Sequence, residues 1–271
     1  MRSFLAFLHK TSFFKRLIPS LIRRSPLVNS LNVRIENFKI NLNLKSTIDR
    51  YIFLNGFYDR EKITYLENQI DLSEYDYFLD IGSNIGFYSL YFASKYKNLE
   101  IHAFEPIEEN YFQIEISKKI NNFKKLNIQK YALSNKKDEV TMWVTDLNKK
   151  GGFAIQDEQD YENQLNVNNY NKNRIHKRVI KSEIFDEKFK FENKKIFIKI
   201  DVERHEFQCL NGMISLLRDS NNKIFIQIEI IDKNKEQVLS FLEELQFRVI
   251  KILKADGKNI SYGHDYYLSN F

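Results

Sequence analysis

The sequence predicts an α/β fold, a Rossmann-like, doubly wound and mainly parallel sheet with helices on both faces. Continuous apolar runs at Tyr77–Ile81 and Ile196–Ile200 are typical of strands buried on both sides. Helical segments of about ten to fifteen residues alternate with such runs, which indicates right-handed crossovers between parallel neighbours. The 271 residues, 43% of them apolar, suffice for one globular domain with appendages.

The expected elements follow one another closely along the chain. The expected strands are a pair within Val33–Leu44, then Tyr77–Ile81, Leu99–Phe104, Leu126–Leu133, Val140–Val144, Ile196–Ile200, Ile224–Ile231, Arg248–Leu253 and Tyr266–Ser269. The expected helices are Phe87–Lys95, Glu108–Ile120, Glu206–Leu217 and Glu236–Leu245. We detect no internal repeat.

Three parts are expected in the chain. Residues 1–30 form a basic amphipathic arm, residues 31–75 a strand and helix extension, and residues 76–271 the main domain. A polar insertion near 146–180 interrupts the main domain. Its centre, Asp157–Arg174, lacks periodicity, which is typical of a functional lid or of disorder.

The net charge of +6 belongs to the arm. The arm carries six basic residues and no acid, and the remaining 36 basic residues equal the 36 acidic ones. Its basic residues are Arg2, Lys10, Lys15, Arg16, Arg23 and Arg24. A body without excess charge is a poor binder of nucleic acid unless its charges segregate onto one face, so we expect no nucleic-acid partner.

The arm allows two interpretations. Its apolar residues fall loosely on one helical face, and Pro19 is expected to end or break the helix. The helix either packs on the domain or lies on an anionic membrane surface through residues 1–25, and its imperfect face favours packing.

We expect neither a signal peptide nor a membrane span. A single cysteine, Cys209, excludes an intramolecular disulfide, so the cytoplasm is the expected compartment, with contact at the inner face of the membrane as the alternative.

A glycine turn follows the strand Tyr77–Ile81. Gly82 permits a sharp bend and close approach of a ligand, and Gly86 permits close packing where the next helix begins. Backbone N–H groups at this helix start are expected to receive a carboxylate. A dinucleotide site would require G-x-G-x-x-G, and here Asn84 and Phe87 stand at the second and third glycine positions. Glu105 ends the next strand, where an acid accepts ribose hydroxyls in other adenosine-binding sheets.

The turn D-x-G-x-N-x-G resembles the D/E-x-G-x-G-x-G turn of class I S-adenosylmethionine-dependent methyltransferases. The chain more specifically resembles the FkbM-type family over roughly residues 50–250. The matching stretches are D-I-G-S-N-I-G (Asp80–Gly86), F-E-P with a following asparagine (Phe104–Pro106, Asn110), A-L-S (Ala132–Ser134), K-I-D-V-E-x-H-E (Lys199–Glu206) and L-N-G (Leu210–Gly212). The strand that ends in Glu229 also fits. The resemblance implies methyl transfer, typically to oxygen, on natural-product or glycan acceptors. It departs at Arg204, where the family usually has glycine.

The resemblance also implies a cofactor site for S-adenosylmethionine. Asp80 offers negative charge near the ammonium group of the cofactor. Glu105 offers a carboxylate that can accept both ribose hydroxyls. Ala132 and Leu133 flank the adenine by resemblance. The full set of cofactor residues expected is Asp80, Gly82, Asn84, Gly86, Glu105, Ala132 and Leu133.

Three residues after the strand Ile196–Ile200 are expected to line the transfer site. Asp201 ends this strand, and Glu203 and His205 are candidate general bases, because a hydroxyl that attacks a sulfonium must lose its proton. His205 has the more suitable intrinsic pKa. A solvent-facing helix start is the plainer interpretation of His205. Asp201 and Glu203 with waters could hold Mg²⁺, but no convincing third ligand is present, so we expect no metal.

Three other functions remain open on the sequence. A nucleotide-sugar or NAD-dependent enzyme is disfavoured by Asn84 and Phe87. A non-catalytic or membrane-recruited binding module is favoured by Arg204 and the basic arm. A nucleic-acid methyltransferase would be expected to have an N/D-P-P-Y/F motif, which the chain lacks. The sequence predicts neither the acceptor nor the oligomeric state.

Overall fold

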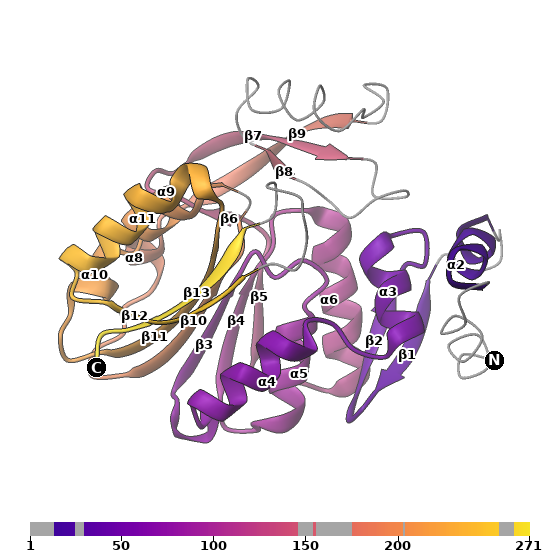
Figure 1. The fold of residues 1–271 in the computed structure, drawn as a ribbon, viewed down its shortest axis with the longest axis horizontal. Helices are drawn as coiled ribbons and strands as arrows, with labels where there is room; N and C mark the ends of the chain where they lie inside the picture. Colours follow the sequence, from indigo (N-terminus) through magenta and orange to yellow (C-terminus); the bar gives the residue numbers. More distant parts are fainter. Residues whose placement is uncertain (1–13, 25–29, 146–153, 156–174, 203, 255–262) are drawn as a thin grey trace.

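The computed structural model describes residues 14–24, 30–145, 154–155, 175–202, 204–254 and 263–271 (Figure 1). Most of the arm and the stretch 157–174, which was expected to be a lid or disordered, lie outside these residues.

Seven strands form the main sheet among the described residues, in the order β12-β13-β11-β10-β3-β4-β5 (Figure 1). Their bounds are β3 Tyr77–Ile81, β4 Glu100–Phe104, β5 Leu126–Gln129, β10 Lys195–Ile200, β11 Lys223–Ile230, β12 Arg248–Leu253 and β13 His264–Ser269. Five neighbours, from β11 to β5, run parallel, and β13 runs antiparallel to both β11 and β12. The predicted α/β class with a mainly parallel sheet is confirmed.

The order of the strands reverses between β3 and β10. The chain proceeds outward from β3 through β4 to β5, then returns to the other side of β3 and proceeds from β10 to β11. Open parallel sheets bind ligands outside the carboxyl ends of the strands at such a switch point. The fold therefore places the ends of β3 and β10, Ile81 and Ile200, at the centre of the edge where a ligand is expected.

Helices cover both faces of the sheet and produce two apolar cores. One core contains Phe78, Phe197 and Phe225 from the sheet and the helices α3, α4, α5 and α6. The other contains Leu79, Ile198 and Ile226 and the helices α8 to α11. The helices are α3 Thr47–Asn55, α4 Arg60–Gln69, α5 Phe87–Lys95, α6 Glu108–Asn121, α8 Phe185–Lys188, α9 Glu206–Asn211, α10 Ile214–Arg218 and α11 Asp232–Glu244, and a short 3-10 helix spans Leu72–Glu74. Because side chains alternate along each strand, one strand serves both cores.

The N-terminal elements join the first core. The hairpin of β1 (Leu31–Ile35) and β2 (Phe38–Leu42) packs on α5 and α6. Helix α2, Phe14–Arg24, continues through Pro19, so the expectation that Pro19 ends or breaks the helix is wrong. Ile18 is buried in the first core and Ile22 packs against it, and this packing on both sides of Pro19 outweighs its lost hydrogen bond. The described part of the arm thus packs on the domain.

The predicted strand Leu126–Leu133 is wrong in its second half. Strand β5 ends at Gln129, and β6 (Ala132–Leu133) pairs instead with Ser182 and Glu183 of a second sheet. This sheet has the order β6-β9-β7-β8, with β7 Asp138–Thr145, β8 Ala154–Ile155 and β9 Ile175–Glu183. Leu133 is buried in the second core, which draws the chain out of line with β5.

The predicted helix Glu206–Leu217 is divided into α9 and α10 by a close contact at Gly212. A Cβ atom at Gly212 would lie 2.0 Å from the carbonyl oxygen of Ser134, so only glycine fits between α9 and the end of β6. The loop that follows Leu133 is thereby held against the helix that follows β10.

Replacing Gly212 by alanine should destabilise the fold. The backbone φ at Gly212 is an ordinary −72°, so the cost comes from the Ser134 carbonyl oxygen alone. We expect a loss of about 1–3 kcal/mol in the free energy of unfolding, measured by urea denaturation. Ser215→Ala on the exposed side of α10 is the control and should change stability by less than about 0.5 kcal/mol. Equal stability of both variants would contradict the assigned contact.

Candidate functional site

Five residues from five neighbouring strands stand in one row at the carboxyl edge of the sheet. Continuing the strand register by one residue places Glu105 beside Gly82, and Gly82 beside Asp201. On its other side, Asp201 lies beside Glu229, which pairs with Asp265. The row before it on the same face consists of Ala103, Asp80, Lys199, Gln227 and Tyr267. Paired residues of neighbouring strands point to the same face, here the face covered by α4 and α5. Two successive rows of mainly polar residues therefore meet where a ligand is expected.

Position 82 requires glycine, because the chain that follows β10 passes very close to it. Its φ is +77°, and a Cβ atom would lie 1.9 Å from the carbonyl oxygen of Asp201. The positive φ agrees with the predicted sharp bend, and the approach of a ligand to Gly82 stays a prediction. Gly86, at φ +75°, packs against Ile114 of α6, which confirms the predicted close packing at the helix start. Asn84 adopts the left-handed conformation, which asparagine tolerates well.

Four N–H groups of this turn donate within the protein. Gly82 and Ser83 both donate to the carbonyl oxygen of Phe104 at 3.0 Å, and Gly86 donates to Ser83 at 2.8 Å. Asn84 donates to Oε2 of Glu105 at 2.8 Å. The expectation that exposed N–H groups of the turn await a carboxylate is therefore wrong for these four, because the end of β4 already satisfies three of them.

Glu105 connects the turn after β3 to the loop after β4. Its Oε1 accepts from the backbone N–H of Ile107 at 2.8 Å, and its Oε2 from that of Asn84. The residue is 4% exposed, and burial raises the pKa of its carboxyl to about 8 despite these hydrogen bonds. The Asn110 side chain also hydrogen-bonds to this carboxyl group. A carboxylate has about four acceptor positions, so about one remains for another donor.

Asp80 anchors the start of α5. Its Oδ2 accepts from Ser89 Oγ at 2.5 Å and from the Ser89 backbone N–H at 3.2 Å. Burial raises the pKa of Asp80, whereas the ammonium group of Lys199 opposes this shift. The Asp80 carboxylate is thus held by the protein itself, and contact with a ligand ammonium remains a prediction.

Lys199 and Asp201 form an ion pair on adjacent rows of β10. The Nζ–Oδ2 distance is 3.0 Å, with the Lys199 side chain 8% exposed and that of Asp201 38% exposed. Burial alone would raise the pKa of Asp201, but the ammonium groups of Lys199 and Lys62 bring it below its ordinary value. Asp201 is therefore a charged carboxylate that remains accessible at the switch point.

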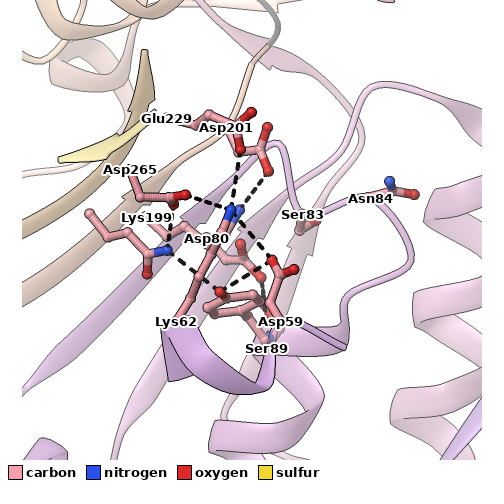
Figure 2. A network of polar contacts seen from close by, with 12 residues as sticks. Asp59, Lys62, Asp80, Ser83, Asn84, Ser89, Lys199, Asp201, Glu229 and Asp265 are labelled. Atoms are coloured by element: carbon pink, nitrogen blue, oxygen red, sulfur yellow. Dashed lines mark hydrogen bonds and ion pairs between the residues drawn. The ribbon is translucent and has the colours of Figure 1, made fainter. Parts of the chain in front are cut away.

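A second group of charged residues lies beside Asp201, and the sequence analysis did not place it there. Lys62 of α4 forms ion pairs with Asp265 at 2.6 Å, with Glu229 at 3.4 Å and with Asp59 at 3.8 Å (Figure 2). Burial alone would lower the pKa of Lys62, but these carboxylates raise it. Glu229 lies near the end of β11 and belongs to the family resemblance, but the sequence analysis assigned it no role. No local pattern indicates that α4 brings Asp59 and Lys62 to them.

His205 lies inside the protein, so the interpretation as a solvent-facing helix start is wrong. Its Nε2 is 3.0 Å from Oγ of Ser134. Ser134 directly follows Ala132 and Leu133, the two residues predicted to flank the adenine. Burial lowers the pKa of His205 to about 4, and Lys136 acts in the same direction. The imidazole is therefore neutral at physiological pH and joins the start of α9 to the loop after β6. Glu203, the other predicted base, lies outside the described residues.

Among the described residues, no group of three or more His, Cys, Asp or Glu side chains is arranged to hold a metal ion. In the same part of the chain, no helix combines the length and apolar character needed to cross a membrane.

The sequence was compared with families and with known proteins. The family model of the methyltransferase FkbM domain matches residues 80–249, which is more than half of the chain. A comparison with curated protein sequences finds no match.

Solved structures share the fold at low sequence identity. A methyltransferase FkbM from Methylobacillus flagellatus KT has a TM-score of 0.50 and 10% identity, covering 98% of this chain and 57% of that chain. Trm5b from Pyrococcus abyssi has a TM-score of 0.50 and 10% identity, covering 91% and 58%. TYW2 from M. jannaschii in complex with AdoMet has a TM-score of 0.45 and 10% identity, covering 90% and 87%.

The chain thus spans less than two thirds of the first two of these proteins. At these identities the likeness shows the fold alone. The family match over residues 80–249 agrees with the motifs at the turn after β3, at the end of β4 and at the end of β10. It confirms the predicted recognition, and with it the cofactor class. The chain belongs to the FkbM family of S-adenosylmethionine-dependent methyltransferases.

Proposed function

We propose that this protein transfers the methyl group of S-adenosylmethionine to a hydroxyl oxygen of a saccharide or of a natural-product-like acceptor. The observation that carries the proposal is the pair of carboxylates Glu105 and Asp201, which lie on either side of Gly82 at the switch point. When bound, the sulfonium ion supplies an electrophilic methyl group. The protein has to hold the ribose, balance the positive charge and align an oxygen with the methyl carbon.

The residues present fit this cofactor. Glu105 has about one acceptor position left for a ribose hydroxyl, and a second hydroxyl can take the place of the Asn110 side chain. The hydrogen bond from Asn84 fixes Glu105 at the turn. Asp80, Gly82, Asn84 and Gly86 build that turn, with the charge of Asp80 near the expected ammonium. The family resemblance places the adenine beside Ala132 and Leu133. The loop that follows them is held in place at Ser134, which contacts His205 and packs against Gly212.

Asp201 is the best placed of the three residues proposed for the transfer site. Its carboxylate is charged, partly exposed and adjacent to Gly82 in the row. The geometry of His205 favours a positioning role over the base role, because its ring is buried and engaged with Ser134. Glu203 follows Asp201 by two residues and remains a candidate base by sequence.

Two features support a small or glycan acceptor over nucleic acid. The chain outside residues 1–30 has equal numbers of acidic and basic residues, and the described edge of the sheet carries more carboxylates than lysines. A chain of balanced charge and an edge rich in carboxylates do not attract a phosphate backbone.

We also propose a cytoplasmic location. Packing of Ile18 and Ile22 on the core makes membrane contact through residues 1–25 the less supported alternative.

The acceptor can be found directly. The wild-type protein and tritium-labelled S-adenosylmethionine are added to an extract of the source cell, and the labelled product is identified. A label on a carbohydrate or metabolite hydroxyl is the expected result. A label on RNA or protein would contradict the proposed acceptor class, and the absence of any label would contradict catalysis.

Glu105→Gln should weaken the binding of S-adenosylhomocysteine by roughly tenfold to a hundredfold, because hydrogen bonds to a charged acceptor contribute about 1.5–3 kcal/mol. Glu108→Gln is the matched control, since Glu108 is exposed and pairs only with Lys130 in the described structure. Isothermal calorimetry measures both. Equal affinity of the two variants would remove Glu105 from the cofactor site.

The pKa of Glu105 adds a pH dependence. Its ordinary pKa of 4.5 is raised to about 8 by burial, so the charged form that accepts two hydroxyls becomes more populated as pH rises through 8. Affinity of the wild type for S-adenosylhomocysteine should therefore rise between about pH 6 and pH 8 relative to the Gln variant. Parallel pH profiles would indicate that Glu105 does not change its charge on binding.

His205→Ala should weaken the binding of S-adenosylhomocysteine several-fold, because it releases Ser134 and the loop behind Leu133. Ser134→Ala should have the same effect, and the double variant should be no weaker than either single one, since both remove one interaction. Normal affinity of the His205 variant with reduced turnover would instead support the base role.

Arg204 stands in a backbone conformation that glycine prefers. Its φ is +76°, held by its own N–H to Glu206 Oε1 at 2.8 Å and by Asn234 Nδ2 to its carbonyl oxygen at 3.2 Å. This explains physically why glycine is usual there in the family. An arginine at this turn is also the observation that favours a non-catalytic binding module.

Arg204→Gly should be more stable than Arg204→Ala by about 1 kcal/mol in urea unfolding, since only glycine adopts this conformation without steric cost. Equal stability would contradict the strain. If labelling of the acceptor appears only with the glycine variant, Arg204 marks a lost activity and the binding module is the better account.

A further inference from the structure

Glu229, Asp265, Lys62 and Asp59 form a charged cluster, here called the β11 cluster, at the edge of the sheet. It lies on the far side of Asp201 from Glu105, because Glu105 follows β4 and Glu229 lies near the end of β11 in the strand order β11-β10-β3-β4. Three strand spacings separate them, roughly 14 Å. The β11 cluster is therefore too far along the edge to share the ribose with Glu105, and no role in the proposed function uses it.

We propose that the β11 cluster is the acceptor subsite and that Glu229 is the catalytic residue that takes the proton from the acceptor hydroxyl. The inference rests on the proposed function, and it assigns the proton acceptor that the sequence analysis sought in Glu203 and His205.

The position of Glu229 is built into the fold. A Cβ atom at Gly263 would lie 2.6 Å from Cγ of Glu229 and 3.1 Å from its Oε1, so the chain before β13 must pass close to this side chain. Lys62 Nζ contacts the other carboxylate oxygen, Oε2, at 3.4 Å. The Glu229 side chain is 31% exposed, so its carboxyl group remains open to a ligand.

A second observation also points to a ligand. Gln227 precedes Glu229 by two residues on the same face and is 1% exposed. Its Nε2 donates to Asp265 at 3.0 Å and to Tyr88 Oη at 3.5 Å, whereas its Oε1 is buried without a hydrogen-bond partner among the described residues. An unpaired buried amide oxygen is costly, and a donor that enters the β11 cluster, or a water bridging to it, would satisfy it.

The electrostatics suit a proton acceptor. The charged and titratable groups that face Glu229 are Tyr58, Asp59, Lys62, Lys199, Asp201 and Asp265. Burial and the negative charge of Asp201 raise the pKa of Glu229 to about 7, whereas Lys62 opposes the shift. A general base works best when its pKa lies near the working pH.

The proposed step balances. The acceptor O–H bond breaks and its proton goes to a carboxylate oxygen of Glu229, while an electron pair of the oxygen forms the bond to the methyl carbon. The pair of the breaking S–C bond stays on sulfur, which becomes a neutral thioether.

The same charges select the acceptor. Five carboxyl groups, of Asp59, Asp80, Asp201, Glu229 and Asp265, face two ammonium groups, of Lys62 and Lys199 (Figure 2). An excess of carboxylates repels phosphate and carboxylate groups. The acceptor should therefore present a neutral or amine-bearing polyol to this edge, and not an anionic one.

The test compares Glu229→Gln with Glu74→Gln. Glu74 forms an ion pair with Lys195 at the opposite end of β10, at 2.6 Å, and is the matched control. The probe is the acceptor fraction of the source-cell extract that the wild type labels. Glu229→Gln should lower kcat by about 10²–10⁴-fold and remove the acidic limb of the pH profile near 7, with unchanged affinity for S-adenosylhomocysteine. Glu229→Asp keeps a titrating carboxyl and should retain that limb at a reduced rate.

A readout independent of turnover is the unfolding temperature. Because the folded pKa of Glu229 lies above its ordinary value of 4.5, its contribution to stability is lost as pH rises toward 7. The unfolding temperature of Glu229→Gln relative to wild type should therefore rise between about pH 5 and pH 7.5, and that of Glu74→Gln should not.

The outcomes separate the two proposals. Full activity of Glu229→Gln on a fraction that the wild type labels would overturn the role of Glu229 and leave the proposed function intact. A pH-independent difference in unfolding temperature would also overturn it. A wild type that binds S-adenosylhomocysteine but labels nothing overturns both proposals.

Discussion

The site depends on one close contact, the approach of the Asp201 carbonyl oxygen to Gly82 where the order of the strands reverses. A side chain at residue 82 would occupy the position of that oxygen. The contact joins the ends of β3 and β10, and through their register it aligns the ends of β4 and β11 with them. Glu105, Asp201 and Glu229 stand in one row as a result. The glycine that a motif search reads as a ligand-binding feature acts here first on the protein itself.

The charged groups around this contact contribute little to the stability of the fold. Lys62, Lys199 and their carboxylate partners are largely buried, and buried ion pairs seldom stabilise a fold more than apolar residues of the same size. Their arrangement is better explained by the proposed chemistry. Carboxylates that repel one another in the free protein are stabilised when one of them takes up a proton, which is the role proposed for Glu229.

The sequence predicted the fold class and the central elements because their signals are local. Phe87–Lys95 coincides with α5, and Tyr77–Ile81 with β3. It failed where tertiary contacts decide. The Ser134 carbonyl divides Glu206–Leu217 at Gly212, and pairing with β9 removes Ala132 and Leu133 from β5. Glu105, Gly82 and Asp201 lie side by side because each follows a parallel strand, which the sequence indicates. Asp59 and Lys62 come from a helix far away in sequence and could not be predicted from a motif. No local pattern indicates that Lys199 is a buried partner of Asp201.

A crystal structure of the complex with S-adenosylhomocysteine tests the central claim most directly. The account predicts that both ribose hydroxyls lie within hydrogen-bond distance of the Glu105 carboxylate and that the sulfur faces Asp201, with Glu229 beyond it. A ligand bound elsewhere, or with its ribose turned away from the end of β4, would contradict the account.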